Sequence, residues 1–210
     1  MSHPFQHVVT DGSELRQLVG EPNEVVIKKQ LSRLDAHCRS FIAASPFALL
    51  ATSDGAGRCD VSPKGDTPGF VLVLDESHLA VPDRPGNRRI DGMRNIIENP
   101  HVGLIFLIPG REETLRVNGR AWIVRDADLL ARMEVQGKRP QLAIGVEVEE
   151  CFLHCAKAFK RSKLWQPGEW PDTSRVASMA QMLLDHTGEP GQTVEGVQRR
   201  LEEGYRTRLY

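Results

Sequence analysis

The middle of the chain consists of short apolar runs separated by turns of only a few residues, and this spacing restricts the fold more than any other feature. Residues 47–52 are apolar and end at the turn 53–57, and residues 69–75 pass through a short turn into the apolar run 78–81. Connections this short join antiparallel strands, because parallel strands need a crossover of a dozen residues or more. We therefore expect a β-rich α+β protein whose antiparallel strands form a closed or split β-barrel rather than a doubly wound sheet.

The remaining segments predict helices on both sides of this β-rich middle. Ile27, Leu31, Leu34 and Cys38 recur at three- and four-residue steps, which is typical of one apolar helix face. We expect a single domain with an N-terminal helical segment 1–45, a barrel core 46–165 and a C-terminal helical tail 166–210. The other expected elements are strands at 59–62, 102–108, 113–124 and 142–148, and helices after Asn87 and at 126–136, 155–164, 174–185 and 194–205.

Charge and hydropathy exclude several classes of partner. The net charge is -1, whereas nucleic-acid binders usually carry a basic surplus. No apolar run reaches the roughly 18–20 residues that a membrane span needs, and the first residues lack the basic start and apolar stretch of a signal peptide. We expect a cytoplasmic protein without nucleic-acid or membrane partners, in which Cys38, Cys59, Cys151 and Cys155 stay reduced.

The segment 82–89, Pro-Asp-Arg-Pro-Gly-Asn-Arg-Arg, has the residues of an anion site. Asn87 is a favourable N-cap for the helix that follows, and Arg88 and Arg89 place two guanidinium groups at the start of that helix. Helix N-termini attract anions, and Arg binds phosphate through paired hydrogen bonds. The spacing indicates a phosphate monoester site, and a solvated basic turn is an equally open interpretation.

Two strand segments carry further candidate ligand contacts. Ser62, Pro63 and Lys64 follow the first hairpin; proline is expected to break the strand there, which would free backbone groups for a ligand, and Lys64 offers a cation. Thr114 and Arg116 share one side of a later strand because side chains alternate along strands. From the residues alone, a plain surface turn and an exposed strand face remain the simpler interpretations of these two segments.

Taken in order, these segments resemble the pyridoxamine 5′-phosphate oxidase-like FMN proteins. The resemblance rests on 62–66 (Ser-Pro-Lys-Gly-Asp), the segment 82–89, Asn99-Pro100 and 115–119 (Leu-Arg-Val-Asn-Gly), and it covers about residues 40–160. It implies an FMN-binding split β-barrel that pairs as a homodimer with FMN at the interface. The chain has no counterpart of the Arg-x-His substrate segment of the true oxidases, which argues against pyridoxamine phosphate as the substrate.

The resemblance also assigns residues to the cofactor. It implies that Ser62, Pro63 and Lys64 lie along the isoalloxazine, that Val81 and Pro82 lie beside the ring, and that Asn87, Arg88 and Arg89 hold the phosphate. It places Thr114 and Arg116 at the cofactor, with Thr114 at a position where the family often has Gln. It also implies that Trp165 is an aromatic residue contributed across the interface. No residue is assigned to catalysis.

The function expected from these features is an FMN-dependent oxidoreductase acting on an unidentified small-molecule substrate. A non-catalytic flavin carrier or sensor, a barrel that uses a deazaflavin or haem, and a domain that has lost its cofactor remain alternatives, with His101 and His154 as lone candidate haem ligands. Cys151, His154 and Cys155 are close in sequence, but a zinc site usually needs a second ligand pair at a distance. We expect no metal there.

Overall fold

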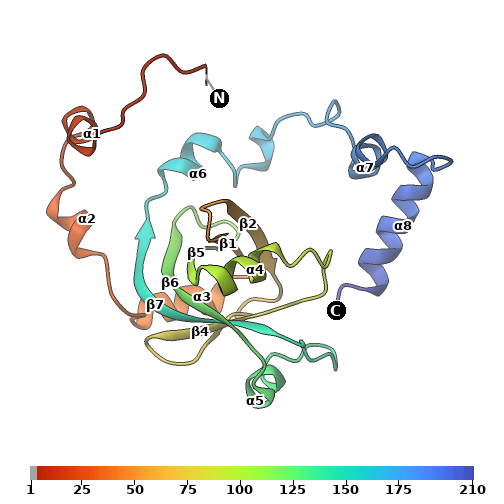
Figure 1. The fold of residues 1–210 in the computed structure, drawn as a ribbon, viewed down its shortest axis with the longest axis horizontal. Helices are drawn as coiled ribbons and strands as arrows, with labels where there is room; N and C mark the ends of the chain where they lie inside the picture. The colour runs from red at the N-terminus through yellow and green to blue at the C-terminus, as the bar shows by residue number, and fades with distance from the viewer. Residues whose placement is uncertain (1–3) are drawn as a thin grey trace.

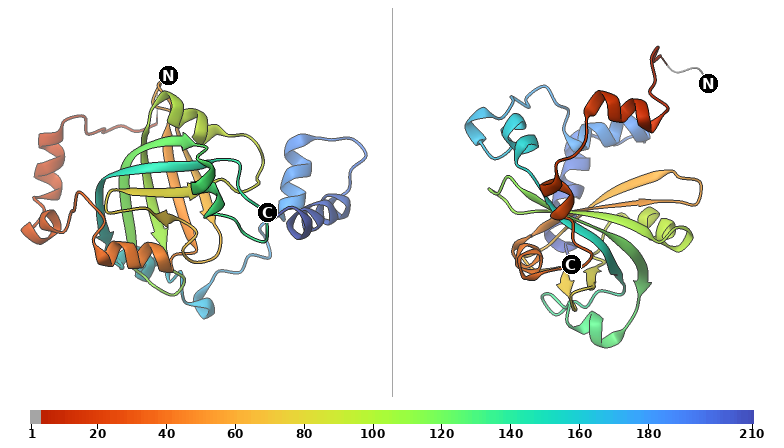
Figure 2. Two further views of the ribbon diagram at one scale, coloured as in Figure 1. Left: turned by 90° about the horizontal axis from the view of Figure 1, so that it is seen from below. Right: turned by 90° about the vertical axis from the view of Figure 1, so that its left-hand side faces the viewer.

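A computed structural model describes residues 4–210, and these residues form one seven-stranded antiparallel sheet with flanking helices (Figure 1). The strands follow the order β2-β1-β5-β6-β7-β4-β3. The strong bend of the sheet gives half of a barrel that is not closed (Figure 2). The β-rich α+β class predicted from the short connections is confirmed. The strands are β1 (Phe47–Ser53), β2 (Cys59–Gly65), β3 (Leu72–Val73), β4 (His78–Pro82), β5 (His101–Leu107), β6 (Thr114–Val124) and β7 (Ala143–His154).

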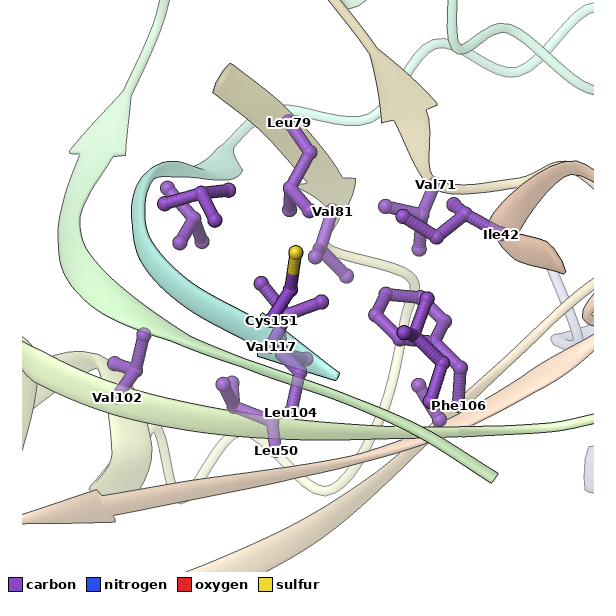
Figure 3. Close-up of a cluster of buried hydrophobic side chains, with 14 of the residues drawn as sticks. Ile42, Leu50, Val71, Leu79, Val81, Val102, Leu104, Phe106, Val117 and Cys151 are labelled. Carbon is purple, nitrogen blue, oxygen red and sulfur yellow. The ribbon is translucent and has the colours of Figure 1, made fainter. Parts of the chain in front are cut away.

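The concave side of the sheet holds the main apolar core (Figure 3). Leu50, Leu104, Val117 and Cys151 are directly opposite one another on β1, β5, β6 and β7, and all four are almost fully buried. This row exists because side chains alternate across each strand and antiparallel partners point to the same side. The core therefore fixes which residues of every strand face outward.

Helices cover the open side of the sheet or lie outside it. The helix α3 (Ala36–Ala44) buries Cys38, Phe41 and Ile42 against the core, and the Asp35 carboxylate caps it by accepting the Cys38 N–H at 2.7 Å. Within residues 4–210, no helix is both long and apolar enough to span a membrane. The remaining helices are α1 (Gly12–Val19), α2 (Glu24–Lys28), α4 (Asp91–Glu98), α5 (Ala127–Ala131), α6 (Lys157–Ser162), α7 (Met179–Thr187), α8 (Val194–Thr207) and a 3₁₀ turn at Pro167–Glu169.

The first and last helices form two arms on opposite sides of the sheet (Figure 2). The arm with α1 and α2 reaches the sheet through Leu31, which pairs with Cys151 of β7. The predicted continuous apolar face from Ile27 to Cys38 is therefore wrong as a single helix: α2 ends at Lys28, and α3 starts afresh at Ala36. The backbone pairing of Leu31 with the sheet interrupts the helix between them.

Several predicted boundaries also need correction. The predicted strand 69–75 contains only the two residues of β3, whereas the strand expected at 142–148 extends to His154 as β7. Pro63 does not break its strand: β2 continues to Gly65, with Pro63 opposite Leu49. Because β2 is an edge strand, a proline can lie in it without removing a hydrogen bond of the sheet.

One glycine lets β6 and β7 approach each other at a bulge. The register shifts between Asn118 and Gly119, and a Cβ at position 119 would lie 1.9 Å from the carbonyl oxygen of Glu147. No side chain fits at that distance. The bulge separates the first part of β6, which carries Thr114 and Arg116, from the second part beside α5.

Candidate functional site

The segments 62–64 and 82–89 lie close together, although β2 and β4 are near opposite ends of the strand order. Asp66, one residue beyond β2, forms a buried ion pair with Arg84 of the loop after β4, with 2.7 Å between Arg84 Nε and Asp66 Oδ2. The helix α4 is bound to the same strands through Asn95. Its side-chain amide donates to Thr52 Oγ1 of β1 at 3.0 Å and to Asp60 Oδ2 of β2 at 2.8 Å. These polar contacts tie β2, the loop and α4 into one unit.

Ser62 and Lys64 extend the core-facing rows of the sheet beyond the apolar core. They are directly opposite Leu50 and Ala48, whose side chains are buried, so they point to the concave side, and Pro63 points to the outer face. The Lys64 ammonium is close enough to Asp83 to change the pKa of its carboxyl group. Burial raises the pKa of Asp83, and the Lys64 ammonium partly offsets this rise. Asp83 is thus a carboxylic acid whose charged form is disfavoured at the candidate site.

The segment 82–89, which we call the phosphate loop after its predicted ligand, has strained backbone at one position within it and at one directly after it. Arg88 and Ile90 have positive φ values of 61° and 55°, a conformation that costs energy for residues other than glycine and is concentrated at functional sites. Asn87 is not the N-cap of the helix, contrary to the prediction. Its side chain accepts the Arg89 N–H at 3.0 Å, and α4 starts later, with Ile90 as an N-cap that provides no side-chain hydrogen bond.

This arrangement leaves the start of α4 open to an anion. The first N–H groups of a helix have no partner within the helix, and no side chain caps them here. Arg88 makes no ion pair with any residue in 4–210, whereas Arg89 pairs with Asp91 at 2.8 Å. Two arginines and the uncapped N–H groups therefore belong to the same short segment, 88–92.

Val81 and Pro82 end β4, immediately before the rest of the phosphate loop, but their side chains are not available to a ligand. Val81 is fully buried in the core at the end of β4, and Pro82 is buried as well. Contact of these residues with a flavin ring stays a prediction, and it would have to use their backbone atoms.

Thr114 and Arg116 lie on the opposite face of the same sheet. They alternate with Leu115 and Val117, which are fully buried in the core, so they point outward in the same direction as Pro63. The Arg116 guanidinium lies 4.3 Å from the centroid of the Phe152 ring, and its Nη2 is 3.3 Å from Glu150. Its Nε is buried and has no hydrogen-bond partner, which is unusual for a charged group and indicates a missing acceptor.

One chain therefore contains two separate halves of the predicted cofactor site. Ser62 and Lys64 belong to the concave side, and Thr114 and Arg116 belong to the outer face. Trp165 also stays within its own chain: its Nε1 donates to the Arg111 carbonyl at 2.8 Å, and its ring stacks on Phe159. A contribution of Trp165 to the cofactor site of a second chain stays a prediction.

A contact that the sequence analysis missed joins the tail to the site. The Tyr210 hydroxyl donates to Asp66 Oδ1 at 2.8 Å, and Arg84 lies over the Tyr210 ring at 5.7 Å from its centroid. Burial raises the pKa of Asp66, but hydrogen bonds from the Thr67 N–H, Tyr210 and Arg84 outweigh burial and hold the pKa below its ordinary value. Nothing in the sequence could indicate this pairing, because 144 positions separate Asp66 from Tyr210.

The cysteines form no metal centre within residues 4–210, where no three potential ligands come together. All four thiols are free. Cys38 and Cys151 are buried, with 3.8 Å between their sulfur atoms, and burial raises the pKa of Cys38 to about 12. Burial, Arg116 and Lys29 together lower the pKa of the nearby His154, which favours its neutral form.

Comparison with protein families identifies the chain. A family model described as pyridoxamine 5′-phosphate oxidase matches residues 34–155, more than half of the chain. The chain belongs to this family. The matched region of the pyridoxamine 5′-phosphate oxidase family includes the whole sheet and every candidate residue discussed above except Trp165 and Tyr210. The split-barrel fold predicted from the resemblance is confirmed at the level of the family.

Solved structures give more distant similarities. The chain is 18% identical to HupZ of Group A Streptococcus, covering 57% of this chain and 92% of that one with a TM-score of 0.46. It is 21% identical to HutZ, the heme storage protein of Vibrio cholerae (58% and 94%, TM-score 0.40), and 8% identical to an FMN-binding protein of Syntrophomonas wolfei (68% and 96%, TM-score 0.43). No curated protein matches the chain.

Proposed function

We propose that the protein is an FMN-dependent oxidoreductase that works as a homodimer on a small-molecule substrate. The observation that carries the proposal is the phosphate loop, where Arg88 and Arg89 flank an uncapped helix start in strained backbone. Strained backbone of this kind is concentrated at ligand-binding and active sites. Membership in the family supports a flavin as the ligand.

The residues of the loop fit the phosphate of FMN. Arg88 has no competing partner among the described residues, and the α4 N–H groups add donors that favour an anion. On the concave side, Ser62 and Lys64 would face the ring, and the Lys64 ammonium would stabilise negative charge at its edge. Bound FMN would supply the electron chemistry, while these side chains bind and orient it.

The second chain would complete the site. The outer face exposes Val61 and Phe47, at 63% and 37% of their surface, beside Pro63 and in the same sheet face as Arg116. A second copy of the chain on this face would cover both exposed side chains. It would also lie beside Thr114 and the exposed part of the Arg116 side chain, which gives these two residues a role at the cofactor of the partner chain.

A haem is the second candidate ligand, because His154 offers a neutral imidazole. Its lowered pKa keeps the ring nitrogen free to act as a ligand near neutral pH, and the ring lies 5.1 Å from that of Phe152. The spectrum separates the two candidates, because a haem gives one intense Soret band, whereas a flavin gives two weaker bands, one at shorter and one at longer wavelength than the Soret band.

The test is the visible spectrum of the purified protein, with mass identification of the molecule released by heat. A flavin spectrum with the mass of FMN is expected. A colourless protein that also fails to bind added FMN would contradict the cofactor, and a Soret band would favour haem. Turnover of the bound flavin with a reductant and an acceptor then separates an enzyme from a non-catalytic carrier or sensor.

Substitution of both arginines tests the phosphate loop. The double variant Arg88→Ala with Arg89→Ala should bind FMN at least about 100-fold more weakly, since two charge-assisted contacts of roughly 1.5–3 kcal/mol each are lost. Flavin titration followed by fluorescence quenching measures the affinity. Arg94→Ala is the matched control, because Arg94 is an exposed arginine of α4 itself. Equal affinity of the double variant and the control would disprove the assignment.

A further inference from the structure

A second hollow, with no residue of the phosphate loop in its lining, lies on the outer face of β4, β6 and β7 beside α5. Its volume is about 510 Å³, within the range of small-molecule sites. Trp122 and Gly145 are directly opposite each other in this face and alternate with the buried core residues Ala121, Ile144 and Val146. The sheet therefore separates the hollow from the main core. We call it the α5 groove.

The floor and walls of the α5 groove are apolar. At its floor, a Cβ on residue 145 would lie 3.3 Å from Val124 Cγ1, so glycine leaves space that any other residue would fill. Trp122, Val124, Leu129 and Leu74 line the sides. Trp122 and Leu74 remain 47% and 39% exposed, which is a large apolar surface for a groove with no occupant among the described residues.

The rim of the groove has an excess of negative charge. Asp126, Asp128 and Glu147 line it, and none of them forms an ion pair with a residue in 4–210. The opposing charges are few. Arg132 also lines the groove, and His78 is already paired with Asp75 at 3.0 Å. Arg120, opposite Glu147 on the same sheet face, adds a second guanidinium beside Trp122. Three unpaired carboxylates thus face two guanidinium groups that form no ion pair with a residue in 4–210, and the remaining excess of negative charge favours a cation.

We propose that the α5 groove binds an organic cation, an ammonium group on an aromatic or branched apolar body. The body would occupy the apolar floor and walls, and the ammonium would lie at the carboxylate rim. The Trp122 ring adds a face that attracts cations; it already has the Arg120 guanidinium at 6.0 Å. This charge preference is opposite to that of the arginine-rich phosphate loop, and the inference does not depend on the flavin proposal.

Three probes with one body and different head groups test the proposal. Isothermal titration of the protein as purified, with 4-phenylbutylamine, 4-phenylbutanol and 4-phenylbutanoate, should give at least about fivefold tighter binding of the amine than of the alcohol, and the weakest binding for the carboxylate. Added salt should reduce the preference for the amine, because these charges are exposed. Equal affinity for all three, or no binding of the amine, would overturn the proposal.

Substitutions place the binding in the groove. Asp128→Asn and Glu147→Gln should each weaken amine binding about 2- to 5-fold and leave binding of the alcohol unchanged. Glu149→Gln is the matched control, because Glu149 is exposed on the same strand but does not line the groove. An equal loss in the control variant would place the amine elsewhere and contradict the proposal.

Substitution of the aromatic wall gives a second measurement. Trp122→Leu keeps an apolar side chain and should lower the preference for amine over alcohol about 2- to 5-fold, because the attraction of the ring for a cation is lost while the carboxylates stay. A reduced molecular mass of this variant by light scattering would instead identify a second copy of the chain as the occupant and overturn the proposal. If Trp122→Leu does not fold, the two carboxylate variants still decide the question.

Discussion

At the scale of single residues, the buried pair of Asp66 and Arg84 is the contact on which the candidate site depends most. The Asp66 side chain is 1% exposed and that of Arg84 is 15% exposed, so loss of one partner leaves a buried charge without compensation. Asp66→Asn should lower the free energy of unfolding by about 3 kcal/mol, as measured by urea denaturation at pH 7. Asp128→Asn, at an exposed carboxylate without an ion pair, should change it little.

The same pair predicts a pH dependence. Because the folded-state pKa of Asp66 is below its ordinary value of 3.8, its contribution to stability is present above that value and is lost as the pH falls through the folded-state pKa. The stability difference between the protein and Asp66→Asn should therefore shrink in strong acid. A difference that stays constant from pH 7 down to pH 2 would contradict the role assigned to the ionised carboxylate.

Residue types in sequence indicated the chemistry of the site but not its partners. Arg88 and Arg89 were recognisable because adjacent arginines after a glycine favour an anion. The partner of Asp66 was not recognisable, since the hydroxyl of Tyr210 comes from the far end of the chain. The unpaired Arg116 Nε was equally hidden, because it depends on which atoms of neighbouring strands bury it.

At the scale of secondary structure, the bulge between β6 and β7, where Glu149 of β7 has no partner in the register, is the feature most sensitive to substitution. Gly119→Ala would place a Cβ against the backbone carbonyl of Glu147, which cannot rotate away. The expected loss is about 3 kcal/mol of unfolding free energy, measured by urea denaturation. The control is Gly103→Ala, whose Cβ would lie 3.2 Å from the side-chain oxygen of Asn118, a group that can move. Equal effects of the two substitutions would contradict this explanation.

Elements were predicted well where their own residues decide them. The apolar runs and turns predicted the bounds of β1 and β4 to within one residue, because these strands are decided by the apolar residues and turns of the segment itself. Boundaries were wrong where a distant partner decides them. Sheet pairing of Leu31 with β7 interrupts the N-terminal helix, and the side-chain contact of Asn87 with the Arg89 N–H moves the start of α4 to Asp91.

At the scale of the whole molecule, the outer face of the sheet predicts the association state. Val61→Glu introduces a charge into the proposed interface and should convert the dimer to a monomer, measured by light scattering at micromolar concentration. FMN binding should fall with it, since Thr114 and Arg116 of one chain would serve the cofactor of the other. Ile97→Glu is the control, because Ile97 is 77% exposed on α4, outside this face. A monomeric parent protein would contradict the proposal.

The edges of the sheet limit how copies of the chain can join. A sheet that does not close has two edge strands, and an exposed edge invites another strand to add to it, the first step of many aggregates. Here β3 has only two residues, and β2 carries Pro63, which has no N–H to offer an incoming strand. Growth of the sheet from molecule to molecule is disfavoured at both ends, so the half-barrel can remain open without becoming a template for fibres.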